Sequence, residues 1–170
     1  VCDGYSAYRK LDRENPDITF AGCWTHARRY FSDALKALPK AAQKTAKDTV
    51  AYEAVKRIGA IYHLDNQLAA LEPDDRKKQR QITVKPLVEA FFAWVKEIQS
   101  SNRLPKGKTL EGINYCINQE EALKVFLNDG EVPLDNNVTE GALRSFCLHK
   151  HAWKLIDSID GAKSSAIIYS

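Results

Sequence analysis

Two acidic residues stand out because of the elements expected around them. Asp3 ends a short apolar stretch and precedes a glycine, which places a carboxylate at the carboxyl end of a strand, where open α/β sheets build their sites. Glu140 follows Asp135 and Asn136, either of which can cap a new helix. Each acid also has a simpler explanation, since Asp-Gly is a common turn pair and an acidic residue suits a helix N-terminus. The sequence therefore offers two candidate catalytic carboxylates, one toward each end.

Two other segments carry basic and aromatic side chains that could contact DNA. His26, Arg28 and Arg29 follow an expected strand-to-helix junction, where they could contact DNA phosphates. Lys150 and Trp153 combine a cation with a large aromatic ring, which suits backbone contact and base stacking. Solvated arginines at a helix start, and a core tryptophan, are the alternatives.

Several other chemistries are excluded by missing motifs. The sequence has no GxSxG, no HExxH and no glycine-rich phosphate loop. Its four histidines form no recognisable zinc set, and its four cysteines contain no CxxC pair. A nucleophilic cysteine acting with a histidine, Cys23 with His26, stays open because sequence proximity says nothing about geometry.

Length and composition indicate a soluble globular domain. The chain has 170 residues, of which 44% are hydrophobic and 28% charged, with a net charge of +3. That charge is only mildly compatible with a polyanionic partner. No apolar run approaches the roughly 20 residues needed to span a bilayer. The first residues show neither the basic-then-apolar order nor the cleavage site of a signal peptide. We expect a cytoplasmic protein with reduced thiols. Because the sequence starts at Val1 and contains no Met, we expect a piece of a longer protein.

Helical periodicity dominates the elements that must position these residues. A short helix is expected at 6–11, a turn at 15–17, a buried strand at 18–23 and a helix at 26–38. A long helical stretch at 41–71 then follows.

A second long helix is expected at 76–99, with a kink or break near residues 84–85 caused by Pro86. Shorter helices at 109–118 and 120–127 precede a turn at 128–130. The apolar face of the second long helix uses Ile82, Leu87, Phe91, Trp94, Val95 and Ile98.

The order of the motifs resembles one family. The chain contains DGYSAY, then AGCWTHARRYF, a long helical region, FLNDGEVPLDNNVTEGALR, and finally KHAW followed by DGAKSSA. This order closely resembles the insertion-sequence transposases of the IS66 family, over nearly the whole chain.

The resemblance implies a ribonuclease-H-like fold with three acidic residues in the order Asp, Asp, Glu. Asp3 would be the second and Glu140 the third, while the first would lie upstream of Val1. The implied activity is metal-dependent DNA cleavage and strand transfer. Two-metal phosphoryl transfer uses ions about 3.5–4 Å apart, and Mg²⁺ or Mn²⁺ suits carboxylate ligands.

The resemblance also makes the flanking side chains candidates for contact with double-stranded DNA. These are His26, Arg28, Arg29, Asn136, Asn137, Arg144, Lys150 and Trp153. The chain departs from the family pattern at several positions around this edge. Gly141 stands where the family has Arg, and Asp157 where it has Gly. The family's Arg-Lys-Asn-Trp reads Lys150-His151-Ala152-Trp153 here.

We therefore expect an α+β, predominantly helical chain with the upstream strands of a ribonuclease-H-like fold missing. It comprises a partial core at 1–31, a helical insertion at 32–128 and a C-terminal catalytic helix region at 129–170. Alone it should not catalyse strand transfer, because one of three carboxylates is absent. A homo-oligomer is expected from the exposed sheet edge, with helper proteins left open. The alternatives are a non-catalytic helical protein- or DNA-binding module and a metal-dependent nuclease that hydrolyses without joining strands.

Overall fold

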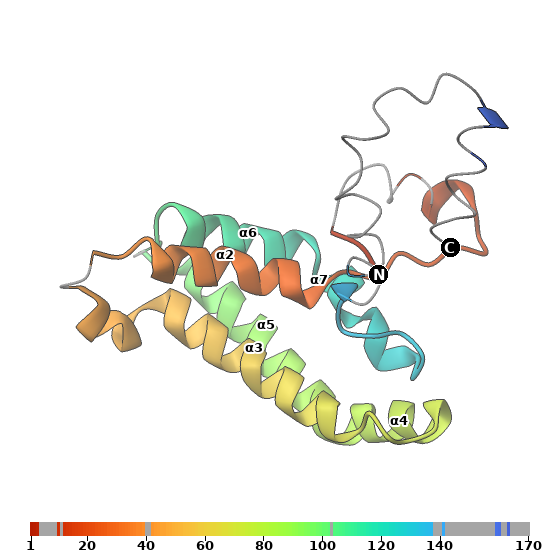
Figure 1. Ribbon diagram of the computed structural model, residues 1–170. Helices are drawn as coiled ribbons and strands as arrows, with labels where there is room; N and C mark the ends of the chain where they lie inside the picture. Colours follow the sequence, from red (N-terminus) through yellow and green to blue (C-terminus); the bar gives the residue numbers. More distant parts are fainter. Residues whose placement is uncertain are drawn as a thin grey trace. The chain divides into compact units, whose positions relative to one another are not determined.

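The computed structural model describes residues 1–3, 10, 12–39, 42–102, 104–137, 141, 159–160 and 163, and of residues 43 and 44 only the backbone. The chain divides into two compact units, Val1–Asp135 and Asn136–Ser170. Helices predominate in the described part of the first unit (Figure 1), which confirms the expectation of a mainly helical chain.

The helical elements run from α2 to η3 in chain order. They are α2 (Trp24–Lys36), the 3₁₀ helix η1 (Ala42–Asp48), α3 (Val50–Gln67), α4 (Pro73–Gln79), the π-helical turn η2 (Arg80–Val84), α5 (Lys85–Ser100), α6 (Lys108–Asn118), α7 (Glu120–Lys124) and the 3₁₀ helix η3 (Val125–Asn128).

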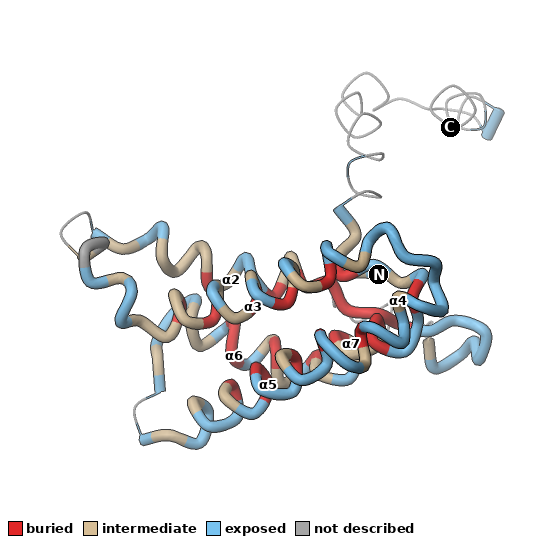
Figure 2. The backbone as a smooth tube through the Cα atoms, turned by 90° about the horizontal axis from the view of Figure 1, so that it is seen from below, coloured by how far each residue is buried: buried red, intermediate tan, exposed pale blue. Residues whose placement is uncertain are grey.

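Four of these helices, α2, α3, α5 and α6, form a bundle. α2 packs against α3 and α6, and α5 packs against the same two helices, so the four close into a ring. Buried positions line the inner sides of the helices (Figure 2). In α5 the inner side carries Val88, Phe91, Phe92 and Val95, each at most 1% exposed, at the steps of three and four that define one helical face.

Trp24 lies at the centre of the hydrophobic core. Its ring packs against Phe91, Phe92 and Phe126, with centroid distances of 5.5, 5.9 and 6.3 Å. The indole Nε1 donates a hydrogen bond to the carbonyl of Leu123 at 2.9 Å, so its buried N–H is satisfied. The first residue of α2 therefore ties that helix to α5, α7 and η3.

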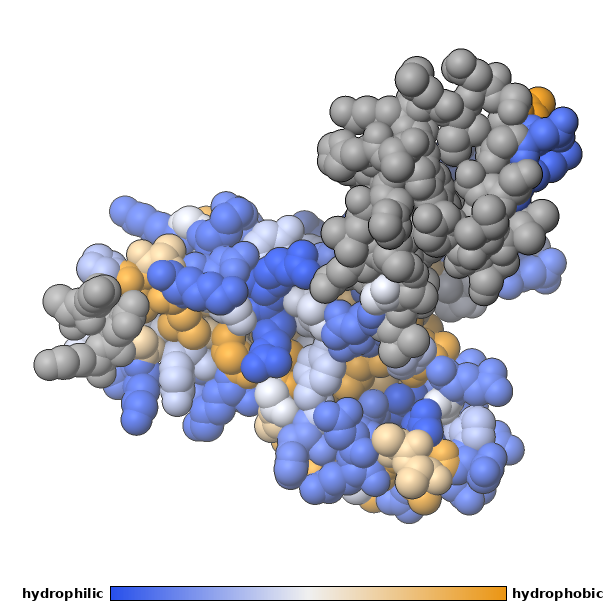
Figure 3. Space-filling model, viewed as in Figure 1, coloured by the Kyte–Doolittle hydropathy of each residue, from blue (hydrophilic) through white to orange (hydrophobic). Residues whose placement is uncertain are grey.

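The outward sides of the helices are mostly hydrophilic, with hydrophobic residues showing at intervals between them on the face seen in Figure 3. Within the described residues, no helix combines the length and the apolar character needed to cross a membrane.

The helix expected at 41–71 is two elements separated at Thr49. Thr49 has an extended backbone, and its side chain accepts a hydrogen bond from the Tyr52 amide at 3.2 Å, which makes it the N-cap of α3. The residues before it form η1. The expectation of one continuous helix was wrong here because a hydroxyl side chain starts a new helix.

The break expected near residues 84–85 is confirmed as a π-helical turn. The amide of Lys85 donates to the carbonyl of Arg80, five residues earlier. Pro86 has no N–H, and its ring crowds the carbonyl four residues before it. The wider turn accommodates Pro86 in the first turn of α5.

The buried side of this region runs through Arg80, Val84 and Val88, at steps of four residues. Ile82 falls on the opposite side and is 66% exposed. The assignment of Ile82 to the apolar face was therefore wrong, because its spacing of five residues from Leu87 is not that of one α-helical face.

The N-terminal segment pairs in parallel with the segment before α2. The amide of Cys2 donates to the carbonyl of Ala21 at 3.0 Å, and Cys2 forms a parallel bridge with Gly22. Apart from this bridge, the prediction of a strand at 18–23 was wrong. Ile18 is 47% exposed, and the Phe20 amide donates to the Asp12 carboxylate at 2.8 Å instead of to a strand.

The turn expected at 15–17 is confirmed, since the Ile18 amide donates to the carbonyl of Asn15 at 3.0 Å. The helix expected at 6–11 lies almost entirely outside the described residues. Lys10 and residues 12–14 are helical.

Candidate active site

Three consecutive residues at the start of α2 join two segments that are distant in the sequence. We call them the α2 junction; they are Cys23, Trp24 and Thr25. On one side, the amide of Cys23 donates to the carbonyl of Cys2 at 3.1 Å. The junction thereby holds the segment that ends in Asp3.

On its other side, the junction holds the segment that leads toward Glu140. The amide of Trp24 donates to the carbonyl of Leu134 at 3.0 Å. The hydroxyl of Thr25 donates to the Oδ2 atom of Asp135 at 3.1 Å. Residues 1–3 and 134–135 therefore meet at one place, the beginning of α2.

Asp3 is exposed at the end of the N-terminal segment. Its carbonyl accepts a hydrogen bond from the Tyr115 hydroxyl of α6 at 3.2 Å. The ring of Tyr115 packs against Tyr30, with centroids 5.3 Å apart. Burial raises the pKa of Tyr115 well above its usual range, so this hydroxyl stays a donor at neutral pH. The bundle thus fixes the backbone that carries the Asp3 carboxylate.

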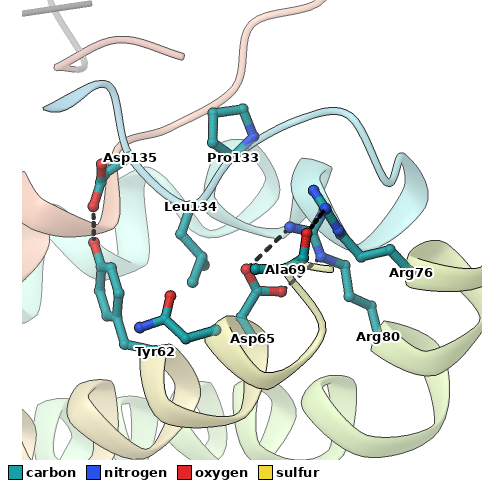
Figure 4. A pocket seen from close by; sticks show the side chains of 9 residues that line it. Tyr62, Asp65, Ala69, Arg76, Arg80, Pro133, Leu134 and Asp135 are labelled. Carbon is teal, nitrogen blue, oxygen red and sulfur yellow. Dashed lines mark hydrogen bonds and ion pairs between the residues drawn. The ribbon is translucent and has the colours of Figure 1, made fainter. Parts of the chain in front are cut away.

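Asp135 is held by two hydroxyl groups from different helices. Tyr62 of α3 donates to Asp135 Oδ2 at 2.9 Å (Figure 4). The bond from Thr25 reaches the same oxygen at 3.1 Å, and the two hydroxyl oxygens are 3.1 Å apart. Burial raises the pKa of Tyr62 well above its usual range; the Asp135 charge adds to this, while the hydrogen bond with Thr25 opposes it.

A buried arginine holds the segment that leads out of η3. Arg80 is 1% exposed, and its Nη1 donates to the carbonyls of Phe126, Asp129 and Val132 at 2.9, 2.7 and 2.9 Å. Its Nε and Nη2 donate to the two carboxylate oxygens of Asp65 at 2.7 and 3.0 Å. Since Nη1 has two hydrogens for three acceptors, at least one hydrogen bond is shared.

The same segment lies very close to α4. A Cβ atom at Gly130 would stand 1.8 Å from the Pro73 carbonyl oxygen, so no larger residue fits without a backbone shift. Arg76 donates from Nη1 to the Gly130 carbonyl and from Nε to the Leu68 carbonyl, each at 3.2 Å, and from Nη2 to the carbonyl of Ala69.

A small cavity of about 160 Å³ lies between the end of α3 and residues 133–135 (Figure 4). Its lining includes Asp65, Asn66, Arg76 and Asp135. Such polar walls suit ordered water better than an apolar ligand.

The predicted DNA-contacting residues are only partly described. Arg28 and Arg29 are exposed on α2, whereas His26 is half-buried. The buried Nδ1 atom of His26 makes no hydrogen bond with the described residues. Asn136, half-buried, and Asn137, exposed, begin the second unit. The remaining predicted site residues lie outside the described residues; these are Glu140, Arg144, Lys150 and Trp153.

Sequence reasoning missed four residues that hold this region together: Thr25, Tyr62, Asp65 and Arg80. Two of them, Asp65 and Arg80, could have been recognised from the sequence pattern. Asp65 follows Ile61 by four positions and Arg80 precedes Val84 by four, so each is a charged residue within an apolar helical stripe. A buried charge needs a partner, and each is the other's partner.

Of the two predicted metal ligands, Asp3 and Glu140, the structure describes Asp3. Across the described residues, no group of three or more His, Cys, Asp or Glu side chains is gathered as a metal site. An exposed carboxylate is nevertheless the hard oxygen ligand that Mg²⁺ takes together with water and phosphate, so Asp3 fits the role of one ligand among several.

Comparison with known proteins decides the family. A family model described as "Transposase IS66 family" matches residues 1–164. The chain belongs to this family. Its relatives include two uncharacterized proteins of Sinorhizobium fredii. Protein y4hP is 34% identical over 161 residues, covering 89% of this chain and 28% of y4hP. Protein y4qI is 31% identical over 149 residues, covering 84% of this chain and 26% of y4qI.

A third relative from Sinorhizobium fredii, the uncharacterized protein y4jD, is 24% identical over 173 residues, covering 99% of this chain and 32% of y4jD. The chain therefore spans about a third or less of the curated relatives it matches. No solved structure is significantly similar to it.

Proposed function

We propose that this IS66 chain is the part of a DDE transposase that contributes two metal-binding carboxylates, Asp3 and Glu140, to the cleavage and joining of double-stranded DNA. The third carboxylate would come from elsewhere in the longer protein. The fold around these acids would be ribonuclease-H-like, with the helical bundle inserted between them.

The meeting of two distant segments at the α2 junction carries this proposal. One of them ends in Asp3, and the other ends in Asp135, shortly before Glu140. Two-metal catalysis requires carboxylates from distant parts of a chain to converge on ions about 3.5–4 Å apart. A helical binding module without catalysis would not depend on the two acids converging.

The parallel pairing of Cys2 with Gly22 supports the same proposal. Parallel neighbours require a crossover connection, as in α/β sheets. Asp3 follows the first of the two paired segments, at the carboxyl edge where such sheets build their sites.

Mg²⁺ or Mn²⁺ held by these carboxylates would activate the attacking oxygen and stabilise the leaving oxygen in phosphoryl transfer. Tyr115 binds the backbone carbonyl of Asp3 and Cys23 that of Cys2, contacts that would hold the first of these ligands in place. The exposed side chains of Arg28 and Arg29 are proposed to contact DNA phosphates.

Replacing either acid in the full-length protein tests the proposal. Asp3→Asn and Glu140→Gln preserve side-chain size and remove the charge. Each should lower the rate of metal-dependent cleavage of labelled element-end DNA on the order of 10³-fold, because each ligand contributes several kcal/mol to the transition state. Binding of the same DNA, measured by gel shift, should remain.

Asp17→Asn and Glu131→Gln are matched controls, since both remove one charge from an exposed position, and both should cleave at the wild-type rate. Undiminished cleavage by Asp3→Asn or Glu140→Gln would contradict the site assignment. Wild-type protein that cleaves element ends but never joins them to target DNA would instead indicate the hydrolytic nuclease.

A further inference from the structure

Helix α2 carries the excess positive charge of the bundle. Its residues include three cations, Arg28, Arg29 and Lys36, and one carboxylate, Asp33. The other three helices of the bundle, α3, α5 and α6, each contain equal numbers of acidic and basic residues. Positive charge is therefore concentrated on one helix, whereas the charges of its neighbours are balanced.

Polar residues form one stripe along α2, at the steps of three and four residues that define a helical face. They are His26, Arg29, Asp33 and Lys36, and we call them the outer face of α2. The buried residues of the helix fall on its opposite side. Arg29 and Lys36 are exposed, and Arg29 has no ion-pair partner among the described residues.

A further cation lies beside this face. Lys108, the first residue of α6, has its Nζ atom 5.9 Å from the centroid of the Tyr30 ring on α2. Lys36 pairs with Asp33 at 3.3 Å, and Lys108 pairs with Glu111 at 2.7 Å. Exposed ion pairs of this kind contribute little to stability, so either ammonium group can exchange its carboxylate for a phosphate.

The outer face of α2 starts close to the segment that ends in Asp3. The amide of Cys23 holds this segment through the carbonyl of Cys2, and α2 runs from there toward η1 (Figure 1). At about 1.5 Å per residue, His26 and Lys36 are about 15 Å apart along the helix. Phosphates of one B-DNA strand recur about every 3.4 Å along the axis, so the face spans about four base pairs.

We propose that the outer face of α2, together with Lys108, binds the phosphate backbone of double-stranded DNA over about four base pairs next to the position of Asp3. Arg29, Lys36 and Lys108 are the contacting cations, and Asp33 weakens the contact. This inference rests on the proposed function for its partner, and it extends the DNA contact from the first turns of α2 to the whole helix. Phosphate contacts position a duplex without reading its sequence, so this surface sets the path of the DNA and not the choice of site.

The test is a salt titration of DNA binding by the full-length protein. Arg29→Gln, Lys36→Gln and Lys108→Gln should each weaken binding of element-end DNA about 5-fold. Each should also lower the slope of log Kobs against log salt concentration by about 0.9. The triple variant should bind on the order of 10²-fold more weakly, and a scrambled duplex of the same length should show the same losses.

Asp33→Asn should have the opposite effect. It removes the one carboxylate of α2 and should strengthen DNA binding about 3-fold at low salt, a gain that a merely structural role would not produce. Lys56→Gln on α3 is the matched control, because Lys56 is also exposed and also pairs with an acid three residues earlier, Glu53 at 3.6 Å. It should bind DNA like the wild type.

Circular dichroism establishes that each variant is folded. A triple variant with the affinity and salt slope of Lys56→Gln overturns the proposal, and so does unchanged or weaker binding by Asp33→Asn. With saturating DNA, kcat of the triple variant should equal that of the wild type, because the three cations bind DNA and do not hold metal.

The outcome is separable from that of the proposed function. An inactive Asp3→Asn protein together with a triple variant that binds DNA like the wild type removes the α2 surface alone. A fully active Asp3→Asn protein removes the catalytic assignment, whereas a salt-dependent loss of binding in the triple variant would still establish the surface.

Discussion

The buried pair of Arg80 and Asp65 is the residue-level contact on which the segment after η3 depends. Their side chains are 2% and 11% exposed, and the guanidinium also lies over the Phe126 ring, 5.1 Å from its centroid. Burying two charges is costly, and the cost is offset only when the geometry is good and the other donors are satisfied. The three carbonyl acceptors satisfy them here.

Removing one partner of this pair should be severe. Arg80→Met leaves the Asp65 carboxylate buried without its partner and three carbonyls without their donor. We expect the free energy of unfolding to fall by about 3–5 kcal/mol, measured by urea denaturation with tryptophan fluorescence.

Lys78→Met provides the comparison, because Lys78 and Asp75 form an exposed ion pair at 3.0 Å. Such pairs contribute little, so the denaturation midpoint should not move. Equal midpoints for the two variants would show that Arg80 does not hold the segment.

At the level of elements, two helical glycines have opposite surroundings. A Cβ atom at Gly112 in α6 would lie 2.9 Å from the Phe31 ring and 3.0 Å from the Cβ of Tyr30, both on α2. A Cβ atom at Gly59 in α3 would meet nothing within 4 Å. The close approach of α2 and α6 therefore depends on a missing side chain.

Alanine at these positions should change stability in opposite directions. Gly59→Ala should raise the free energy of unfolding by about 0.5–1 kcal/mol through helix propensity. Gly112→Ala should lower it by about 1–3 kcal/mol, because overpacking outweighs the same propensity gain. Thermal denaturation of both variants checks the signs, and a stabilised Gly112→Ala protein would refute the close packing.

Periodicity predicted the helices well because burial of one face decides them, as in α5 and α6. It failed where a single side chain decides. The Thr49 hydroxyl begins a new helix, and the Asp12 carboxylate takes the Phe20 amide that a strand would have used. The break at Pro86 was predictable because proline lacks an N–H and disrupts helical hydrogen bonding in any environment.

At the level of the whole molecule, the first unit should fold without the second. Its residues form a compact body by themselves. A protein truncated after Asp135 should unfold in one cooperative transition at the melting temperature of the longer chain, measured by circular dichroism.

A truncation after Leu127 is the informative counterpart, because it removes Leu134 together with two of the Arg80 acceptors. Its melting temperature should be lower by about 10 °C or more. A loss of cooperativity in the first truncation would contradict an independent unit.

The candidate site was predictable only in part. Asp3 and Glu140 could be singled out because family motifs surround them, and the structure describes the first of these. The contact of Thr25 with Asp135 joins positions 110 residues apart, a separation at which neither spacing nor composition carries a signal. Tyr62 likewise carries no signal of its own in the sequence.

The hydrogen bond between Trp24 and Leu134 joins the two ends of the segment that forms the bundle. The entropy of closing such a loop depends only weakly on its length. The connecting segments at the distant tip, η1 and residues 104–107 (Figure 1), are therefore free to lengthen or shorten without displacing either anchor. Insertions or deletions in these segments would therefore change the length of the bundle and leave the two flanking motifs in place.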